Sequence, residues 1–113
     1  MKVYHNPQCS KSRKVIELLK EKNISFDTIH YLENPLSINE LGKLCNILNI
    51  TPNKLLRRKE LIFKELLKKF GEPNDEDSLQ WMHEHPVLME RPIVVYRGNA
   101  VIARPPEKVL ALL

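Results

Sequence analysis

The chain has 113 residues, a formal net charge of +4 and a hydrophobic fraction of 42%. That length fits one domain, so we expect residues 1–113 to fold as a single domain. The three glycines, Gly42, Gly71 and Gly98, are isolated from one another. Phosphate-binding loops need several glycines within a few residues, which excludes Walker A and GxGxxG nucleotide enzymes. The mildly basic charge favours anionic partners without singling out nucleic acid.

The cellular setting follows from hydropathy and cysteine usage. No apolar run approaches the ~20 residues of a membrane span, and the first residues lack the apolar segment of a signal peptide. We therefore expect a cytoplasmic protein that does not bind a membrane. Two cysteines, Cys9 and Cys45, are too few for a disulfide framework. In a reducing compartment such thiols stay free. Each is then either a small side chain buried in the core or a reactive thiol that takes part in chemistry.

The first third of the chain predicts a strand, a helix and a second strand. Residues 1–5 form a short strand that Asn6-Pro7 interrupts. Apolar residues then recur at helical spacing from Ser10 to about residue 23, and residues 24–31 alternate as a strand does. This order indicates a β-α-β unit.

The middle of the chain predicts helices. Ser37 and Glu40 form a capping box that opens a helix. Thr51-Pro52 marks another helix start, and the apolar stripe across residues 55–70 predicts helix in two segments, ended by Gly71. A further helix is expected after an N-cap at Asp77 or Ser78, and it ends at His85-Pro86.

The last third predicts a hairpin and a helix. Residues 93–96 are β-branched and aromatic, residues 97–100 form a tight turn, and residues 100–103 form a second strand. A final helix is expected over residues 107–113. The complete order predicts an α/β fold of the thioredoxin-like kind: a small mixed sheet flanked by helices, with a helical insertion between its βαβ and ββα halves.

Cys9 is the strongest candidate for chemistry. It follows the first strand and precedes the first helix, where thioredoxin-like folds carry a reactive cysteine and where Pro92 would lie beside it. Unpaired N–H groups at a helix start and the cations His5, Lys11 and Arg13 favour a thiolate. The same N–H groups bind anions. A lone cysteine is also commonly a buried filler, which is the reading we favour for Cys45 on its apolar helix stripe.

The spacing around Cys9 excludes two enzyme classes. The position six residues after Cys9 is Val15, so this is not a Cys-x5-Arg phosphatase loop. Ser12 occupies the second position of a Cys-x-x-Cys motif, so the loop has no dithiol. A second thiol must therefore come from elsewhere.

Several motifs together resemble the glutaredoxin-coupled arsenate reductases. The first is Tyr4-His5-Asn6-Pro7-x-Cys9-x-x-Ser12-Arg13. The others follow in the family's order: Tyr31-Leu32-Glu33-Asn34-Pro35, Leu55-Leu56-Arg57, His85-Pro86, Arg91-Pro92-Ile93-Val94-Val95 and Arg104-Pro105. The likeness spans nearly the whole chain, and we expect no C-terminal extension of the kind that some members carry.

The resemblance implies a function and a set of site residues. It implies that Cys9 is the nucleophile toward arsenate, supported by His5 and Ser12, and that three arginines hold the oxyanion: Arg57, Arg91 and Arg104. It implies glutathione as a co-substrate and glutaredoxin as a partner that releases arsenite. No tightly bound cofactor and no metal are expected.

Other functions remain open from the residues. Spx-like redox regulators, which bind RNA polymerase, share the fold, although many carry a Cys-x-x-Cys loop. Another glutathione-dependent thiol reductase is a second alternative. A nucleic-acid binder is a third, because residues 54–69 contain seven basic positions. No nucleic-acid motif accompanies them, so we expect no nucleic-acid partner. The His83-x-His85 pair lacks a third metal ligand nearby in sequence.

Overall fold

The computed structural model describes all residues, 1–113. The chain divides into two compact units. The first, which we call the sheet unit, comprises Met1–Glu33 and Arg91–Leu113, and the second, the helical unit, comprises Asn34–Glu90. The single domain expected over residues 1–113 stays a prediction. No helix has the length and apolar character needed to cross a bilayer.

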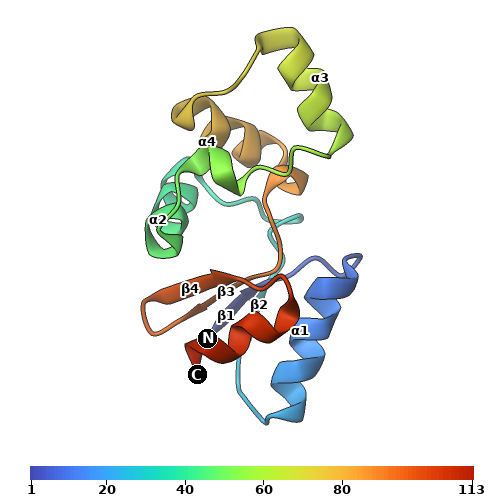
Figure 1. The fold of residues 1–113 in the computed structure, drawn as a ribbon, viewed down its shortest axis with the longest axis vertical. Helices are drawn as coiled ribbons and strands as arrows, with labels where there is room; N and C mark the ends of the chain where they lie inside the picture. The colour runs from blue at the N-terminus through green and yellow to red at the C-terminus, as the bar shows by residue number, and fades with distance from the viewer. The chain divides into compact units, whose positions relative to one another are not determined.

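The sheet unit contains the predicted βαβ and ββα halves. Its four strands have the order β2-β1-β3-β4, with β1 parallel to β2 and the other pairs antiparallel. The thioredoxin-like α/β fold is therefore confirmed. Its elements are β1 (Lys2–Tyr4), α1 (Ser10–Glu21), β2 (Asp27–Ile29), β3 (Ile93–Tyr96), β4 (Asn99–Ile102) and the 3-10 helix η3 (Pro106–Leu112) (Figure 1).

The core of the sheet unit joins the sheet to two helices. Val15 and Leu19 lie four residues apart on α1, so they share one helix face, and both are fully buried. They pack with Val3 of β1, Val94 of β3 and Val109 of η3. Burial of each such side chain stabilises the fold by about 1.5–3 kcal/mol. This core fixes the start of α1 relative to the end of β1.

The β3–β4 hairpin turns at Arg97 and Gly98. Both have positive φ, 51° and 76°, as a two-residue turn between twisted strands requires. Glycine adopts this conformation freely, whereas arginine does so at a cost. The Arg97 guanidinium lies 4.9 Å from the centre of the Tyr96 ring, a contact that offsets part of that cost. The second strand begins at Asn99, one residue before the predicted start.

The helical unit corresponds to the predicted insertion. Its elements are α2 (Ile38–Leu48), the 3-10 helix η1 (Pro52–Leu55), α3 (Leu61–Phe70), α4 (Asp75–Glu84) and the 3-10 helix η2 (Pro86–Leu88). The capping box at Ser37 and Glu40 is present in full. Helix α4 packs against α2, η1 and η2, and its Trp81 meets Phe63 of α3 edge to face at 5.9 Å.

The helical stripe across residues 55–70 falls into two segments as predicted, η1 and α3, and Leu56 between them pairs with Met89 in a β-bridge. Three sequence predictions of local structure need correction. Helix α4 is capped by Asn74, not by Asp77 or Ser78, because Asn74 Oδ1 accepts the Asp77 N–H at 2.8 Å. Strand β2 covers only residues 27–29 of the predicted 24–31, and residues 106–112 form a 3-10 helix.

Candidate active site

Cys9 occupies the N-cap position of α1 in the sheet unit. Its carbonyl oxygen accepts the Arg13 N–H at 3.0 Å, and its own N–H donates to the Asn6 carbonyl at 3.0 Å. The side chain is neither fully buried nor fully exposed. The buried Val15 and Leu19 hold α1 in place, so the thiol stays at the positive end of that helix. The predicted position of Cys9 after β1 and at the helix start is confirmed.

Several groups act on the pKa of Cys9. Partial burial raises it, and hydrogen bonds to the sulfur from the Ser12 N–H, the Arg91 guanidinium and the Lys11 N–H lower it. The charge of Arg91 lowers it further. The lowering groups prevail, so the pKa of Cys9 lies below its usual value. A lowered pKa provides more thiolate, the nucleophilic form, at neutral pH.

Ser12 organises the loop between β1 and α1. Its side chain is completely buried. Its Oγ accepts the Asn6 N–H at 3.0 Å and lies 2.6 Å from His5 Nδ1. Asn6 in turn accepts the Gln8 N–H on Oδ1 at 2.9 Å. These bonds fix the backbone on both sides of Cys9, which orients the Ser12 N–H toward the sulfur.

His5 contacts the site through Ser12. Burial lowers the pKa of His5, and the nearby His30 and Arg13 lower it further. A lowered pKa favours the neutral imidazole near neutral pH. In this arrangement His5 contacts the Cys9 loop through its hydrogen bond with Ser12, and the lowered pKa disfavours the positive charge expected from the sequence.

Two of the predicted arginines lie in the sheet unit. The Arg91 guanidinium hydrogen-bonds the Cys9 sulfur, and Arg104 donates from Nη1 to the Arg91 carbonyl oxygen at 3.2 Å. Both arginines precede a proline in a cis peptide bond, Arg91-Pro92 and Arg104-Pro105. A continuous set of contacts thus joins five predicted site residues: His5, Ser12, Cys9, Arg91 and Arg104.

Comparison with known proteins identifies the family of this chain. The model of the ArsC family matches residues 4–112, nearly the whole chain. The chain belongs to the ArsC family. Its curated relatives include an uncharacterized protein of Escherichia coli K12, YfgD, which is 44% identical and pairs 100% of this chain with 96% of its own length. They also include an arsenate reductase of Neisseria meningitidis, 39% identical over 100% of this chain and 97% of the relative.

Solved structures of the ArsC family share the fold. An arsenate reductase from Vibrio cholerae superposes with a TM-score of 0.91 at 43% identity, covering 100% of this chain and 98% of the other. An ArsC-family-related protein from Bacteroides fragilis, 21% identical, superposes with a TM-score of 0.84 over 99% and 97% of the two chains. The second likeness shows the fold alone.

The third predicted arginine of this ArsC-family chain, Arg57, lies in the helical unit. Its guanidinium donates from Nε to Glu60 Oε1 at 3.2 Å and from Nη1 to Glu90 Oε1 at 2.8 Å. The side chain is 18% exposed. The neighbouring Arg58 pairs with Glu72 and is 45% exposed, so it is the more solvated of the two arginines. The role of Arg57 in oxyanion binding stays a prediction.

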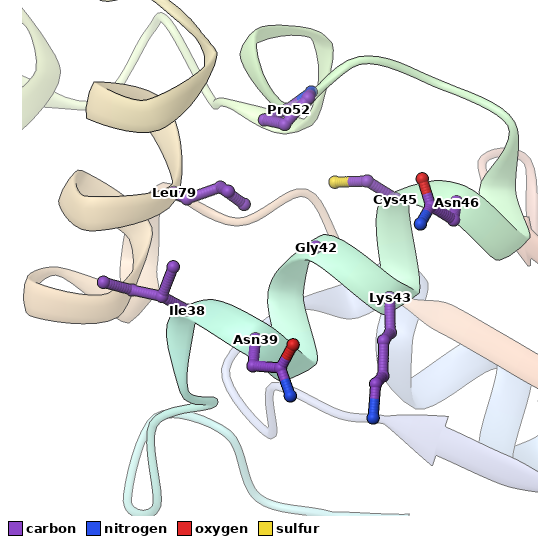
Figure 2. Close-up of a pocket in the computed structure, with 8 residues that line it drawn as sticks. All are labelled: Ile38, Asn39, Gly42, Lys43, Cys45, Asn46, Pro52 and Leu79. Atoms are coloured by element: carbon purple, nitrogen blue, oxygen red, sulfur yellow. The ribbon is translucent and has the colours of Figure 1, made fainter.

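Cys45 is the other thiol of the chain, and it is buried in the helical unit as predicted. Burial and the charge of Asp75 raise the pKa of Cys45 to about 11. Figure 2 shows its side chain on α2 facing Pro52 and Leu79, at the wall of an open hollow of about 430 Å³. The hollow contains one charged side chain, Lys43, and a thiol with little thiolate, so it lacks the features of a nucleophilic site.

Sequence reasoning missed one side chain near Cys9, that of His30, and gave Arg13 only as a cationic neighbour. Arg13, on α1, donates from Nη1 to the Pro7 carbonyl oxygen at 2.8 Å. This bond connects the helix to the loop that precedes it. The ring of His30 lies 6.2 Å from that of His5. A signal for His30 was present, because His5 and His30 follow consecutive strands of a βαβ unit, whose carboxyl ends meet at one edge of the sheet.

Proposed function

We propose that this protein is an arsenate reductase in which the Cys9 thiolate attacks the arsenic atom of arsenate. The observation that carries the proposal is the hydrogen bond from the Arg91 guanidinium to the Cys9 sulfur at the start of α1. A guanidinium and free helix N–H groups beside a thiolate suit a nucleophile whose substrate is an oxyanion. ArsC-family relatives named arsenate reductases, at 36–39% identity, support the choice of substrate.

Arg91 and Arg104 are proposed to bind the oxyanion. Arsenate at neutral pH carries between one and two negative charges, and guanidinium groups bind such oxygens through paired N–H donors. The same donors stabilise the negative charge that builds up on oxygen as sulfur attacks. The resemblance adds Arg57 to this set, and substitution of that residue tests its contribution separately.

The reaction needs two electrons, which two thiols supply. The Cys9 sulfur forms a bond to arsenic, and an oxygen leaves as water after taking up protons. Glutathione then adds its sulfur to arsenic. A second oxygen leaves as water, which gives an adduct of As(V) with Cys9 and glutathione. A glutaredoxin thiolate attacks the glutathione sulfur, so a glutaredoxin–glutathione disulfide forms and the electron pair of the broken As–S bond reduces As(V) to As(III). Water then displaces Cys9 from As(III), which releases arsenite and returns the Cys9 thiolate.

Glutathione is proposed as the second thiol because Cys45 is a poor candidate. Its burial and its pKa of about 11 leave almost no thiolate at neutral pH. Glutathione is thus a co-substrate, and no tightly bound cofactor is part of the proposal.

The test is arsenite formation from arsenate by the purified protein with glutathione and glutaredoxin. Each thiol donor is omitted in turn, and Cys9→Ser serves as the control. Turnover that needs Cys9 and both donors supports the proposal in full. Turnover with another thiol donor retains the reductase and rejects the donor. No arsenite under any condition, with Cys9 still open to alkylation, rejects arsenate as the substrate.

A further inference from the structure

Two histidines meet at the carboxyl edge of the parallel strand pair. Tyr4 of β1 is in register with Ile29 of β2, and the His5 N–H donates to the Ile29 carbonyl at 3.0 Å. His5 and His30 are therefore the next pair beyond the two strands. Their rings meet edge to face, with centres 6.2 Å apart and planes at 66°.

The two rings have different surroundings. His30 is exposed to solvent. His5 is less exposed, and its Nδ1 lies 2.6 Å from Ser12 Oγ. The charged groups that act on His5 are His30, beyond β2, and Arg13, on α1. Both disfavour a proton on His5 when they carry positive charge.

The charge on His5 decides the direction of its bond to Ser12. A neutral His5 with a free Nδ1 lone pair accepts the Ser12 O–H, and Ser12 Oγ then accepts the Asn6 N–H. A protonated His5 must donate to Oγ instead. The hydroxyl hydrogen of the fully buried Ser12 then loses its acceptor. The network around Cys9 thus has one satisfied arrangement, which requires neutral His5.

We propose that His30 is a positioning residue for the Cys9 site, which adds to the effect of burial in keeping the adjacent His5 ring neutral and its Nδ1 available to the Ser12 hydroxyl. His30 acts through His5 and does not touch the sulfur in this role. The inference rests on the proposed function only for its effect on turnover, because the state of the His5 ring is measurable without substrate.

The experiment is a pH titration of the imidazole nitrogens by NMR, in the wild type and in two variants of His30. His30→Phe keeps an aromatic ring and removes the charge, whereas His30→Ala removes both. His85→Phe, in the helical unit, is the matched control. The chain has four histidines, so the signals are assignable by substitution. Urea unfolding of each variant confirms that it is folded, which the exposure of His30 leads us to expect.

In the wild type we expect His5 Nδ1 to be unprotonated at pH 7. In His30→Phe the midpoint of the His5 titration moves to higher pH. The acid limb of the pH profile of kcat/KM for arsenate moves in the same direction. His85→Phe leaves both unchanged. A His5 midpoint that is the same in His30→Phe as in the wild type overturns the inference, even if His30→Ala is altered. A shifted midpoint in a protein that makes no arsenite supports the inference and rejects the proposed function alone.

Discussion

Arg104 donates a hydrogen bond from Nη1 to the carbonyl oxygen of Arg91 at 3.2 Å. Arg104 thus holds the backbone of Arg91 in place. The Arg91 guanidinium in turn hydrogen-bonds the Cys9 sulfur. The backbone position of the guanidinium that lowers the pKa of Cys9 is therefore held by a second arginine. A fixed cation beside a nucleophilic sulfur is what the proposed attack on an oxyanion requires.

The first prediction concerns Arg91. Arg91→Ala removes both a hydrogen bond and a positive charge from the sulfur, so the pKa of Cys9 rises. We expect alkylation of Cys9 at pH 7 to slow by roughly 3–10-fold, because each pKa unit changes the thiolate fraction about tenfold. The pH dependence of iodoacetamide alkylation measures this. Arg97→Ala, at the hairpin turn, is the control and should leave the profile unchanged; equal profiles for Arg91→Ala and the wild type would contradict the assignment.

The second prediction separates the two thiols. Cys9→Ser abolishes arsenite formation and changes the free energy of unfolding by about 0.5 kcal/mol or less, because the side chain is partly exposed. Cys45→Ala keeps turnover and loses about 1–2 kcal/mol of stability, because it opens a small space in the core of the helical unit. Turnover assays and urea unfolding test both. Loss of turnover in a folded Cys45→Ala would give that thiol a part in the reaction.

The sequence predicted most of this site because its determinants are local. A strand, an Asn-Pro break and a helix start place Cys9 without knowledge of distant residues. The grouping of Arg91 and Arg104 with Cys9 was predicted only from the family resemblance. Residues so far apart in the chain carry no local signal that the ends of their strands meet. The β-bridge of Leu56 with Met89 was missed for the same reason. The N-cap of α4 was predicted at the wrong residue, because Asn74, Asp77 and Ser78 all have side chains that favour an N-cap position. The structure shows that Asn74 is the N-cap and that the Asp77 N–H donates to it.

The third prediction concerns Ser12. Ser12→Ala leaves the buried Asn6 N–H without its acceptor, which costs about 1–3 kcal/mol of stability. Urea unfolding measures the loss. Ser10→Ala is the matched control, because Ser10 is exposed at the start of the same helix. Its stability should change by about 0.5 kcal/mol or less. Equal stabilities of the two variants would show that the Ser12 hydroxyl does not hold the loop.

The fourth prediction is a pH dependence of stability. The pKa of Cys9 is lowered in the folded protein, so folding favours the thiolate. The resulting stability is fully present above the unfolded-state pKa and is lost as pH falls through the folded-state pKa. The stability of the wild type relative to Cys9→Ser should therefore be larger at pH 9 than at pH 6. Urea unfolding under reducing conditions at both pH values checks this, and a constant difference would contradict a lowered pKa.

The fifth prediction concerns Arg57. Arg57→Ala leaves the carboxylates of Glu60 and Glu90 without their shared cation, and both are less than a third exposed. We expect a loss of about 1–2 kcal/mol in the free energy of unfolding. Arg58→Ala, whose ion pair is more exposed, should lose about 0.5 kcal/mol or less. A rise in KM for arsenate beyond the stability effect would add Arg57 to the oxyanion ligands, and an unchanged KM would remove it.

The contrast between the two thiols has a practical consequence. Cys9 has a lowered pKa and an accessible side chain, whereas Cys45 is buried with a pKa of about 11. A maleimide fluorophore or a spin label added near neutral pH should therefore attach at a single position without removal of the other cysteine. The chain can thus be labelled at Cys9, in the candidate active site, without any substitution. An activated disulfide at Cys9 would equally serve as bait for the thiol protein that reduces it.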